Sequence, residues 1–340
     1  MSVTIRDVAK AAGVSPSTVS KVLNHSPLIS PETTAHVNAV MKELNYIPNM
    51  RARNFAKQKT KTVVFLTLSE PHMALMNPYI FEIFTGTEEI FHQEDYMLQF
   101  VNALSLEDAY QVIQKLIVTK NADGIILHGY AVSQEITNLL LTEQFPHILI
   151  GKPCFETTSS WIDINNIVAG EIAASFLYDC GIRRMAFIGG RKQDRISQMR
   201  LHGVRQFAVQ RSIPIPKQYV FYGEPTSAEG YMLTTQLLSS STIPDGIICE
   251  NSITAVGVVK AIHEHGLSIP EDISFLCFDN YPFSFMIDPL PTVVDINVHS
   301  LGVEAAKSLL KIIKCPQLHI QSYITFPSVI QRDSTYKRHI

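Results

Sequence analysis

The chain has 340 residues, 46% of them hydrophobic and 17% charged, and its formal net charge at pH 7 is −3. It is too long for one small domain, and its composition allows two or three domains with sizeable cores. The charge balance changes along the chain, because residues 1–61 hold nine Lys or Arg against three Asp or Glu, whereas the remainder holds nineteen against twenty-eight. A basic head on an acidic body indicates that only the head meets a polyanion.

The cysteines and the apolar runs bear on the cellular compartment. Five cysteines are scattered without CxxC spacing, and their odd count implies no complete disulfide framework. No apolar run approaches the roughly 18–20 residues that span a bilayer, and no secretory signal pattern opens the chain. We therefore expect a protein of the reducing cytoplasm that does not enter a membrane.

The first two predicted elements form a helix-turn-helix. Apolar residues at helical spacing predict a helix over residues 5–12, and Gly13 ends it because a tight turn needs freedom in φ. Ser15 then caps a second helix that has Pro16 at its first position, where a missing N–H costs nothing. The apolar residues of this helix face inward and leave Lys21 on a polar outer face, and such a helix fits the major groove of DNA.

A third helix and a basic segment complete the head. Ser30-Pro31 repeats the cap and the proline, and the helix that they open carries one apolar stripe and ends at Tyr46-Ile47-Pro48-Asn49. Residues 50–61 are rich in Lys and Arg and too few for a domain. We interpret them as a linker with a marginal helix, which would form when DNA and a partner chain cover it.

From Thr62 onward, strands and helices alternate, which predicts parallel sheets with helices on both faces. The expected strands cover residues 63–66, 97–101, 124–127, 147–150, 185–188, 219–221, 246–249 and 274–278. The expected helices cover residues 78–92, 106–118, 133–141, 168–178, 198–210, 228–238 and 253–265. Ser105 and Asp108 are placed as a capping box for the second of these helices.

A short repeat divides this alternating region in two. Asp123-Gly124-Ile125-Ile126 has a counterpart in Asp245-Gly246-Ile247-Ile248, 122 residues later. Two lobes of similar design fit the repeat better than one large sheet. Ligands of open α/β sheets bind beyond the carboxyl ends of the strands, so we expect a ligand in the cleft between two facing lobes.

These features together resemble the lactose-repressor (LacI/GalR) family of bacterial transcription regulators along nearly the whole chain. In the head, the matching residues are Thr4-Ile5-Arg6-Asp7-Val8-Ala9, Ala12-Gly13-Val14-Ser15, Thr18-Val19-Ser20-Lys21-Val22-Leu23-Asn24 and Tyr46-Ile47-Pro48-Asn49. In the body they are Asn77-Pro78-Tyr79, Asp123-Gly124, Ile188-Gly189-Gly190, Arg200-Leu201-His202-Gly203, Pro270-Glu271-Asp272-Ile273-Ser274 and Phe278-Asp279-Asn280.

The resemblance implies a division of the chain into three parts. An all-α helix-turn-helix head covers residues 1–48, a hinge helix or linker 49–61, and a two-lobed α/β core like the periplasmic binding proteins 62–340. By the same resemblance, the core is expected to bind the effector and to form the dimer. Its N-lobe is expected at about 62–160 plus 291–322, and its C-lobe at about 161–290 plus 323–340.

The resemblance also places the second helix in the major groove of an operator. Pro16, Ser17 and Lys21 then occupy the positions that choose the operator sequence, and Lys21 suits guanine O6 and N7. Short polar side chains near helix starts suit phosphate oxygens and neighbouring base edges. The residues implied in that second role are Thr4, Ser15, Thr18, Ser20, Asn24, Ser30 and Thr33.

The basic segment resembles the hinge helix of the family, in which an apolar side chain enters the minor groove. Here the corresponding pair is Ala52 and Phe55, with Asn49 and Arg53 as neighbouring DNA contacts, and Phe is an accepted wedge. Arg51 stands where the family usually has an aliphatic residue. The alternative is a solvated basic linker without a role in the groove.

In the cleft, the resemblance implies that Arg200, Asn251 and Asp279 meet the effector. A guanidinium fork, an amide and a carboxylate can bind adjacent hydroxyls of a neutral polyol. Two acidic positions of the family are replaced here, one by Ser252 beside Asn251 and the other by Asn165 at the start of the C-lobe. The loss of these acidic acceptors could admit a phosphorylated or carboxylated ligand.

Three further side chains are candidate effector contacts that also have a structural interpretation. Trp161 lies at the expected lobe crossover, where it and Tyr79 either stack on a sugar or base or belong to the core. Lys152 follows a strand end and points either into the cleft or into solvent. Arg200 and Asp279 could likewise form a structural ion pair instead of binding a ligand.

No catalytic or metal-binding motif competes with this interpretation. The G-x-S-x-G, H-E-x-x-H and phosphate-loop patterns do not occur, so we expect no enzyme and no resident cofactor or metal. The sequence predicts a homodimeric repressor that reads a pseudo-palindromic double-stranded operator and responds to a sugar or sugar derivative. Two alternatives stay open: the same architecture with a purine-like corepressor, and a solute-binding module without a regulatory role.

Overall fold

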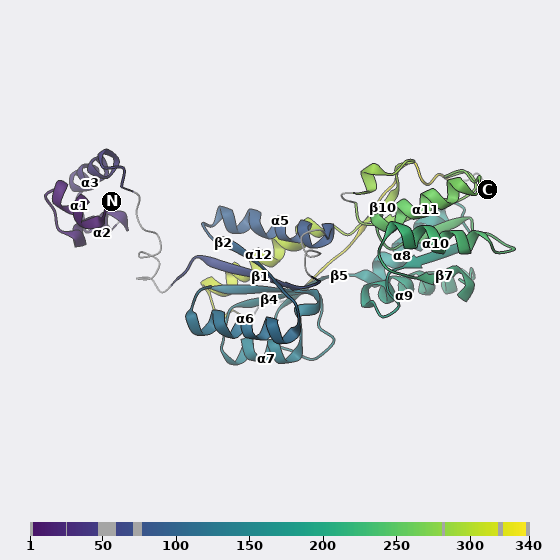
Figure 1. The fold of residues 1–340 in the computed structure, drawn as a ribbon, viewed down its shortest axis with the longest axis horizontal. Coiled ribbons are helices and arrows are strands. Elements are labelled where there is room, and N and C mark those ends of the chain that lie inside the picture. The colour runs from purple at the N-terminus through teal and green to yellow at the C-terminus, as the bar shows by residue number, and fades with distance from the viewer. Residues whose placement is uncertain are drawn as a thin grey trace. The chain divides into compact units, whose positions relative to one another are not determined.

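A computed structural model describes residues 3–24, 26–46, 59–70, 77–280, 283–318 and 322–337. The chain divides into two compact units, residues 1–60 and 61–340, which Figure 1 colours from purple at the N-terminus to yellow at the C-terminus. The first unit is the head and the second is the core.

The head is a bundle of three helices, α1 (Ile5–Ala11), α2 (Pro16–Leu23) and α3 (Pro31–Glu43). Val8, Val19 and Val37, one from each helix, are fully buried in its small apolar core. Gly13, between α1 and α2, has a φ of +63°, a left-handed conformation that favours glycine. The predicted helix-turn-helix is therefore confirmed.

The helix starts of the head follow the predicted caps. Ser15 Oγ accepts the Thr18 N–H at 3.1 Å, and Ser30 Oγ accepts the Thr33 N–H at 3.2 Å. Each hydroxyl satisfies one of the N–H groups that the first turn of a helix leaves without a partner, which fixes where α2 and α3 begin.

The N-lobe of the core is a sheet in the order β11-β5-β4-β3-β1-β2. Its strands are β1 (Thr62–Leu68), β2 (Met97–Ala103), β3 (Gly124–His128), β4 (His147–Ile150), β5 (Trp161–Ile164) and β11 (Tyr323–Thr325), and its helices are α5 (Pro78–Gln93), α6 (Leu106–Thr119), α7 (Gln134–Thr142) and α12 (Val298–Lys314). Side chains alternate along β1: Val63 and Phe65 pack toward α5 and α12, while Val64 and Leu66 pack toward α6 and α7. The sheet is thus covered on both faces, as Figure 1 shows.

The C-lobe repeats this design with the order β12-β10-β9-β8-β6-β7. Its strands are β6 (Met185–Gly189), β7 (Val220–Tyr222), β8 (Gly246–Cys249), β9 (Ser274–Phe278), β10 (Thr292–Asp295) and β12 (Ser328–Ile330), and its helices are α8 (Asn166–Asp179), α9 (Arg195–Gln210), α10 (Ser227–Leu238) and α11 (Ser252–Glu264). Phe187 of β6 packs toward α8 and α9, whereas Ile188 packs toward α10 and α11. Three short 3-10 turns, Gly129–Ala131, Lys217–Tyr219 and Phe283–Met286, join these elements.

The repeat found in the sequence opens equivalent strands of the two lobes. Asp123 precedes β3 and accepts the N–H of Lys61 at 3.0 Å, and Asp245 precedes β8 and accepts the N–H of Arg184 at 2.7 Å. Each carboxylate thus accepts a hydrogen bond from a backbone N–H just before the neighbouring central strand, which is β1 in the N-lobe and β6 in the C-lobe. The two-lobed, periplasmic-binding-protein-like α/β core is confirmed.

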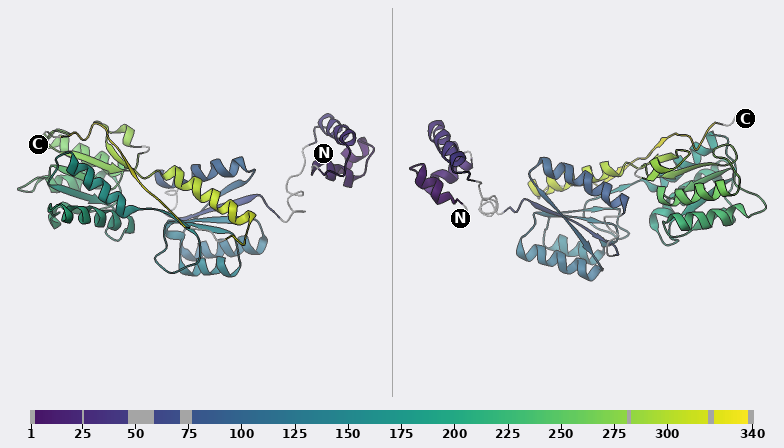
Figure 2. Two further views of the ribbon diagram at one scale, coloured as in Figure 1. Left: turned by 180° about the vertical axis from the view of Figure 1, so that it is seen from behind. Right: turned by 45° about the horizontal axis from the view of Figure 1, so that its top comes forward.

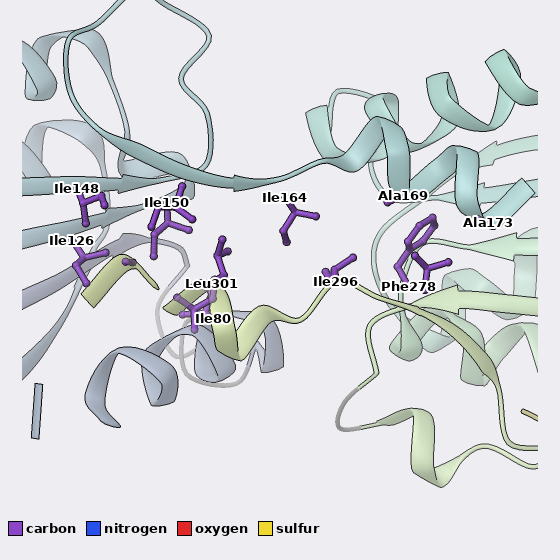
Figure 3. Packing of buried hydrophobic residues seen from close by; sticks show 14 of the residues in the cluster. Ile80, Ile126, Ile148, Ile150, Ile164, Ala169, Ala173, Phe278, Ile296 and Leu301 are labelled. Carbon is purple, nitrogen blue, oxygen red and sulfur yellow. The ribbon is translucent and has the colours of Figure 1, made fainter. Parts of the chain in front are cut away.

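The described chain crosses between the two sheets three times, and each crossing lies one strand later than predicted. Residues 161–164 form β5 of the N-lobe sheet, 292–295 form β10 of the C-lobe sheet, and 323–325 form β11 of the N-lobe sheet. Each of these strands completes the sheet that the chain is about to leave. Buried Ile164 and Ile296 lie on two of the crossing segments, between the parts of one apolar cluster that belong to the two lobes (Figure 3).

Several elements differ from the prediction. The sequence assigned no element after Phe278, although α12 has buried Leu301, Ala305 and Leu309 at helical spacing, and Figures 1 and 2 show it alongside α5. Strand β12 is antiparallel to β10, in an otherwise parallel sheet. Ser105 caps α6 as predicted, but Asp108 accepts the N–H of Leu104 rather than that of Ser105, so the capping box is displaced by one residue.

Three pairs of helices, α5 with α12, α8 with α9, and α10 with α11, cross with their backbones in contact. A Cβ added to Gly203 on α9 would lie 1.9 Å from the carbonyl oxygen of Ile167 on α8, and one added to Gly170 on α8 would lie 1.9 Å from that of Arg200 on α9. The other two crossings have the same reciprocal arrangement, with Gly86 and Gly302 in the N-lobe and Gly230 and Gly257 in the C-lobe.

Candidate functional site

The outer face of α2 is polar and accessible. Pro16, Ser17, Lys21 and Asn24 are exposed, whereas Val19 of the same helix is fully buried in the head. Lys21 lies in the last turn of α2. The second helix therefore presents to solvent the side chains from which the resemblance expects sequence recognition.

The hydroxyl groups of the head form local networks at the helix starts. Ser15 Oγ lies 2.7 Å from Ser17 Oγ and 2.9 Å from Thr18 Oγ1, and Ser30 Oγ lies 2.9 Å from Thr33 Oγ1. These bonds hold the hydroxyls together at the positive ends of α2 and α3, where a phosphate oxygen is favoured.

Two other DNA-contact candidates of the head bind within their own helices. Thr4 donates both its backbone N–H and its hydroxyl to Asp7 Oδ2, at 2.8 and 2.7 Å, and these hydrogen bonds lower the pKa of Asp7. Asn24 Nδ2 donates to the Ser20 carbonyl at 2.9 Å. The other predicted contacts, Asn49, Ala52, Arg53 and Phe55, lie outside the described residues, as does most of the expected hinge helix 49–61.

A cavity of about 480 Å³ is lined by both lobes of the core. Of the eight predicted effector residues, five line it: Tyr79, Arg200, Asn251, Ser252 and Asp279. Asn77, Glu82, Asn297 and His299 add to the N-lobe wall, and Asp194, Glu250, Asn280 and Asp295 add to the C-lobe wall. The cavity thus combines amide, aromatic and charged side chains.

Local structure holds the C-lobe side chains of the cavity in place. Arg200 is on α9, whose close crossing with α8 depends on Gly203, the glycine of the Arg200-Leu201-His202-Gly203 segment. Asn251 caps α11, since its Oδ1 accepts the Thr254 N–H at 2.8 Å, which leaves its Nδ2 group as a donor. Asp279 directly follows β9 and has a φ of +75°, a conformation that Asp tolerates better than most residues.

Arg200 is 4% exposed and pairs with Glu250, not with Asp279. Its Nη1 donates to Glu250 Oε1 at 3.1 Å and to the Glu250 carbonyl at 2.9 Å, and its Nε donates to Asn166 Oδ1 at 3.1 Å. The guanidinium carbon lies 4.1 Å from the centre of the Phe278 ring. The predicted alternative of an Arg200–Asp279 ion pair is therefore wrong, because Glu250 takes that place.

Two acidic groups at the cavity, Glu250 and Asp279, hold protons more tightly than they do in water. Burial raises the pKa of Glu250 to about 7, with Arg200 opposing and the charge of Asp279 reinforcing the rise. Burial also raises the pKa of Asp279 to about 6, which Arg200 opposes and Asp295 reinforces. On the N-lobe side, burial raises the pKa of the Tyr79 hydroxyl, so this group is a neutral donor and acceptor.

The other three predicted effector residues do not line this cavity. Lys152 and Trp161 belong to a second cavity of about 600 Å³ that the N-lobe segment 152–161 lines alone, and Lys152 Nζ lies 5.5 Å from the centre of the Trp161 ring. Asn165 caps α8, because its Oδ1 accepts the Val168 N–H at 3.1 Å, and its own N–H bonds to Thr325 in the neighbouring crossing. The position at which Asn165 replaces an acidic residue of the family is thus the start of α8, beside a crossing between the lobes.

Glu250 is the main cavity residue that the sequence did not predict. It lies directly between the buried strand β8 and Asn251, which was predicted. A carboxylate at the carboxyl end of a buried parallel strand is itself a signal for a site, and this signal was available in the sequence. The partner Arg200 is 50 residues away and on another element, so only the fold reveals the pair.

A head with a polar helix-turn-helix and a two-lobed core with a polar cavity between its lobes define a ligand-responsive DNA-binding regulator. Residues 4–49 match the family model for bacterial regulatory proteins of the lacI family, and residues 174–335 match that for a periplasmic-binding-protein-like domain.

Curated relatives match over nearly their whole length. The HTH-type transcriptional regulator MalR of Streptococcus pneumoniae is 31% identical, with 92% of this chain and 93% of the relative covered. The ribose operon repressor of Escherichia coli is 31% identical, with 97% and 99% covered. The chain belongs to the lacI family of bacterial regulatory proteins.

Solved structures show the same fold. The complex of the transcriptional regulator CelR with cellobiose is 25% identical and has a TM-score of 0.72, with 98% of this chain and 99% of that chain covered. The lac repressor dimer bound to operator and the anti-inducer ONPF is 23% identical and has a TM-score of 0.84, with 99% and 100% covered.

Membership in this family makes the protein a DNA-binding transcription regulator with a small-molecule effector, not an enzyme. Across the described ranges, no helix combines the length and apolar character that crossing a membrane requires.

Proposed function

We propose that the protein is a homodimeric repressor that binds a pseudo-palindromic operator and responds to a sugar or sugar derivative held between its lobes. The observation that carries this proposal is the convergence of Arg200, Asn251 and Asp279 on one cavity that both lobes line. Together they offer a guanidinium, an amide donor and a carboxylate acceptor, which suit the adjacent hydroxyls of a sugar. The relatives support it, since one is a ribose operon repressor and another is solved with cellobiose.

On DNA, α2 of each head enters the major groove of one half-site, and Pro16, Ser17 and Lys21 meet the base edges. Thr4, Ser15, Thr18, Ser20, Asn24, Ser30 and Thr33 contact phosphates or neighbouring edges. Asn49, Ala52, Arg53 and Phe55 contact DNA from the hinge, with Phe55 as the wedge in the minor groove. The protein acts in the cytoplasm, where its operator is.

The effector acts by binding two arrangements of the lobes with different affinity. Residues from both lobes line the cavity, so a ligand that touches both walls favours the arrangement in which the walls are correctly spaced. A ligand held by one lobe alone would have nearly equal affinity for both arrangements and would not change operator binding.

The test begins with an operator selected from random DNA by the parent protein. Lys21→Ala should weaken binding to that operator by about 1–3 kcal/mol, because a correct base contact has that value. Lys42→Ala is the matched control, since Lys42 is in the same head but in the last turn of α3. Fluorescence anisotropy gives both affinities, and equal losses in the two variants would remove Lys21 from base recognition.

A ligand panel then tests the effector. Sugars, sugar phosphates and nucleobases are screened by thermal stability, since a ligand at 100 times its Kd adds about 2.7 kcal/mol to the stability of the state that it binds. Each hit is added to the protein–operator complex. Release of the operator by a sugar supports the proposal, whereas a nucleobase that strengthens operator binding would favour a corepressor instead.

A further inference from the structure

The cavity between the lobes has an excess of acidic side chains. Five carboxylates line it, from Glu82, Asp194, Glu250, Asp279 and Asp295, against one guanidinium, from Arg200. His299, also at the cavity, lies 3.5 Å from Glu89 on α5. Among the described residues that line the cavity, Arg200 is therefore the one permanent cation.

Arg200 is already paired with a carboxyl group of its own lobe. Glu250 Oε1 lies 3.1 Å from its Nη1, and the side chains of both residues are at least nine-tenths buried. Because little water surrounds these two side chains, their charges are weakly screened. Each charge therefore interacts strongly with the other and with a ligand in the cavity. A phosphate or carboxylate that approached Arg200 would have to displace Glu250 or lie beside its charge.

The carboxylate of Glu250 is itself incompletely satisfied. Its Oε2 is buried and has no hydrogen-bond partner among the residues that the structure describes. The Ser197 hydroxyl is near enough to lower the pKa of Glu250, but it does not meet the geometry of a hydrogen bond. Burial and the charge of Asp279 raise the pKa of Glu250 to about 7, which shows how unfavourable further negative charge is at this place.

From these contacts we infer that Glu250 is a specificity-determining residue that makes the cavity exclude anionic effectors and accept neutral polyols. The inference rests on the proposed function, because it takes the interlobe cavity as the effector site. It also reverses an expectation from the sequence: acidic residues are lost at 165 and 252, but Glu250 restores the negative charge next to Arg200. A polyol suits this wall because hydroxyls both accept from the guanidinium and donate to carboxylates.

Glu250→Gln tests the inference, since Gln has nearly the same shape and can still accept from Arg200, but has no charge. It leaves the buried guanidinium without its counter-ion, so an anion should now bind there. Glu224→Gln is the matched control, because Glu224 pairs with Arg191 at 2.7 Å in the same lobe, in an exposed position that does not line the cavity. Arg200→Gln with Glu250→Gln gives a neutral pair that should not bind anions.

The probes are sulfate, glucose 6-phosphate and glucose, titrated calorimetrically into each full-length variant at constant ionic strength and at pH 8, where a Glu250 with a pKa of about 7 is mainly ionised. We expect Glu250→Gln to bind sulfate and glucose 6-phosphate at least about tenfold more tightly than the parent does, while the control and the double variant remain like the parent. The inference is overturned if Glu250→Gln gains no affinity for sulfate, or if the double variant gains as much.

If Glu250→Gln does not fold, the inference can still be tested by measuring sulfate binding to the parent protein. Saturable binding of sulfate by the parent, lost in Arg200→Gln with Glu250→Gln, would overturn the inference, and absence of such binding supports it. These titrations need neither DNA nor an inducer. If no sugar releases the operator, the proposed function fails, yet the effect of Glu250 on anion binding is still measured.

Discussion

The two lobes arrange their strands in the same order, and yet they bring different chemistry to the cavity. The described residues of the N-lobe wall are mainly uncharged, among them Tyr79, Asn77 and Asn297, and Glu82 is the one carboxylate among them. The C-lobe wall has the buried Arg200–Glu250 pair together with Asp194, Asp279 and Asp295. The same fold in both lobes therefore gives an N-lobe wall that can contact a ligand through uncharged hydrogen-bonding groups and a C-lobe wall that can contact it through charged groups.

This difference arises where the strands end. In the N-lobe, the strands equivalent to β8, β9 and β10 are β3, β4 and β5, which are followed by the uncharged residues Gly129, Gly151 and Asn165. Burial also lowers the pKa of His128, the last residue of β3, to about 4. In the C-lobe, β8, β9 and β10 end at Glu250, Asp279 and Asp295. Equivalent backbone positions thus hold different residue types, which shows that the fold fixes the place of the site but not its chemistry.

The largest effect is expected from Arg200→Ala, which leaves Glu250 buried without its partner. We expect a loss of about 3–5 kcal/mol in the free energy of unfolding, measured by urea denaturation, and loss of the effector response while operator binding is retained. Arg191→Ala breaks an exposed pair with Glu224 in the same lobe and should cost at most about 1 kcal/mol. Similar losses in both variants would contradict a special role for the buried pair.

The pH dependence of the free energy of unfolding gives a second test of the charged C-lobe wall. Burial raises the pKa of Glu250 from 4.5 to about 7, so the folded state binds this proton more tightly than the unfolded state does. The stability that Glu250 contributes is present below about pH 4.5 and is lost as the pH rises through about 7, with a slope of up to about 1.4 kcal/mol per pH unit.

The measurement is the difference in unfolding free energy between the parent and Glu250→Gln as a function of pH. The difference is needed because buried His128, whose pKa is lowered to about 4, acts in the opposite direction over much of the same range and is common to both proteins. Arg200, Asp279 and Asp194 also influence Glu250 and are unchanged in the variant. A difference that does not decline between pH 4.5 and 7 would show that Glu250 stays ionised throughout.

The smallest effect is expected at the N-lobe wall. Tyr79→Phe keeps the ring and removes the hydroxyl, which should weaken effector binding by about 0.5–1.5 kcal/mol, as for a neutral hydrogen bond. Calorimetry with a ligand found in the screen measures this loss. Tyr110→Phe, on α6 away from the cavity, is the control. A loss for Tyr79→Phe as large as that for Arg200→Ala would end the distinction between the walls.

Much of the fold could be predicted from the sequence because its signals are local. Ser15 with Pro16 and Ser30 with Pro31 mark two helix starts within a few residues, and the structure has helices that begin there. The alternation of strands and helices, with its repeat at Asp123 and Asp245, likewise predicted the two lobes. Strands β5, β10, β11 and β12 were missed because they lie around the crossings, where one strand follows another without an α-helix between them, so they are not part of the alternation by which equally short strands such as β4 and β7 were predicted.

The site was less predictable than the fold because it depends on contacts between distant residues. Arg200 was placed by resemblance, but its partner Glu250 could be identified only when α9 and the end of β8 were brought together. Lys152 and Trp161 were candidate effector contacts with a structural alternative, and the structure places both at a separate cavity, with Lys152 Nζ 5.5 Å from the centre of the Trp161 ring. The sequence shows that a residue follows a strand, but it does not show which residue of another element its side chain will contact.

The reciprocal glycines at the three helix crossings have a mechanical consequence. At Gly170 and Gly203, as at the other two crossings, each helix occupies the space in which a side chain of its partner would begin, so neither can slide or turn without a backbone collision. We therefore expect these three helix pairs to move as rigid units, and any change in the arrangement of the lobes to occur at the segments that cross between the sheets. Ligand binding at the cavity should then change the angle between the lobes more than the packing within either lobe.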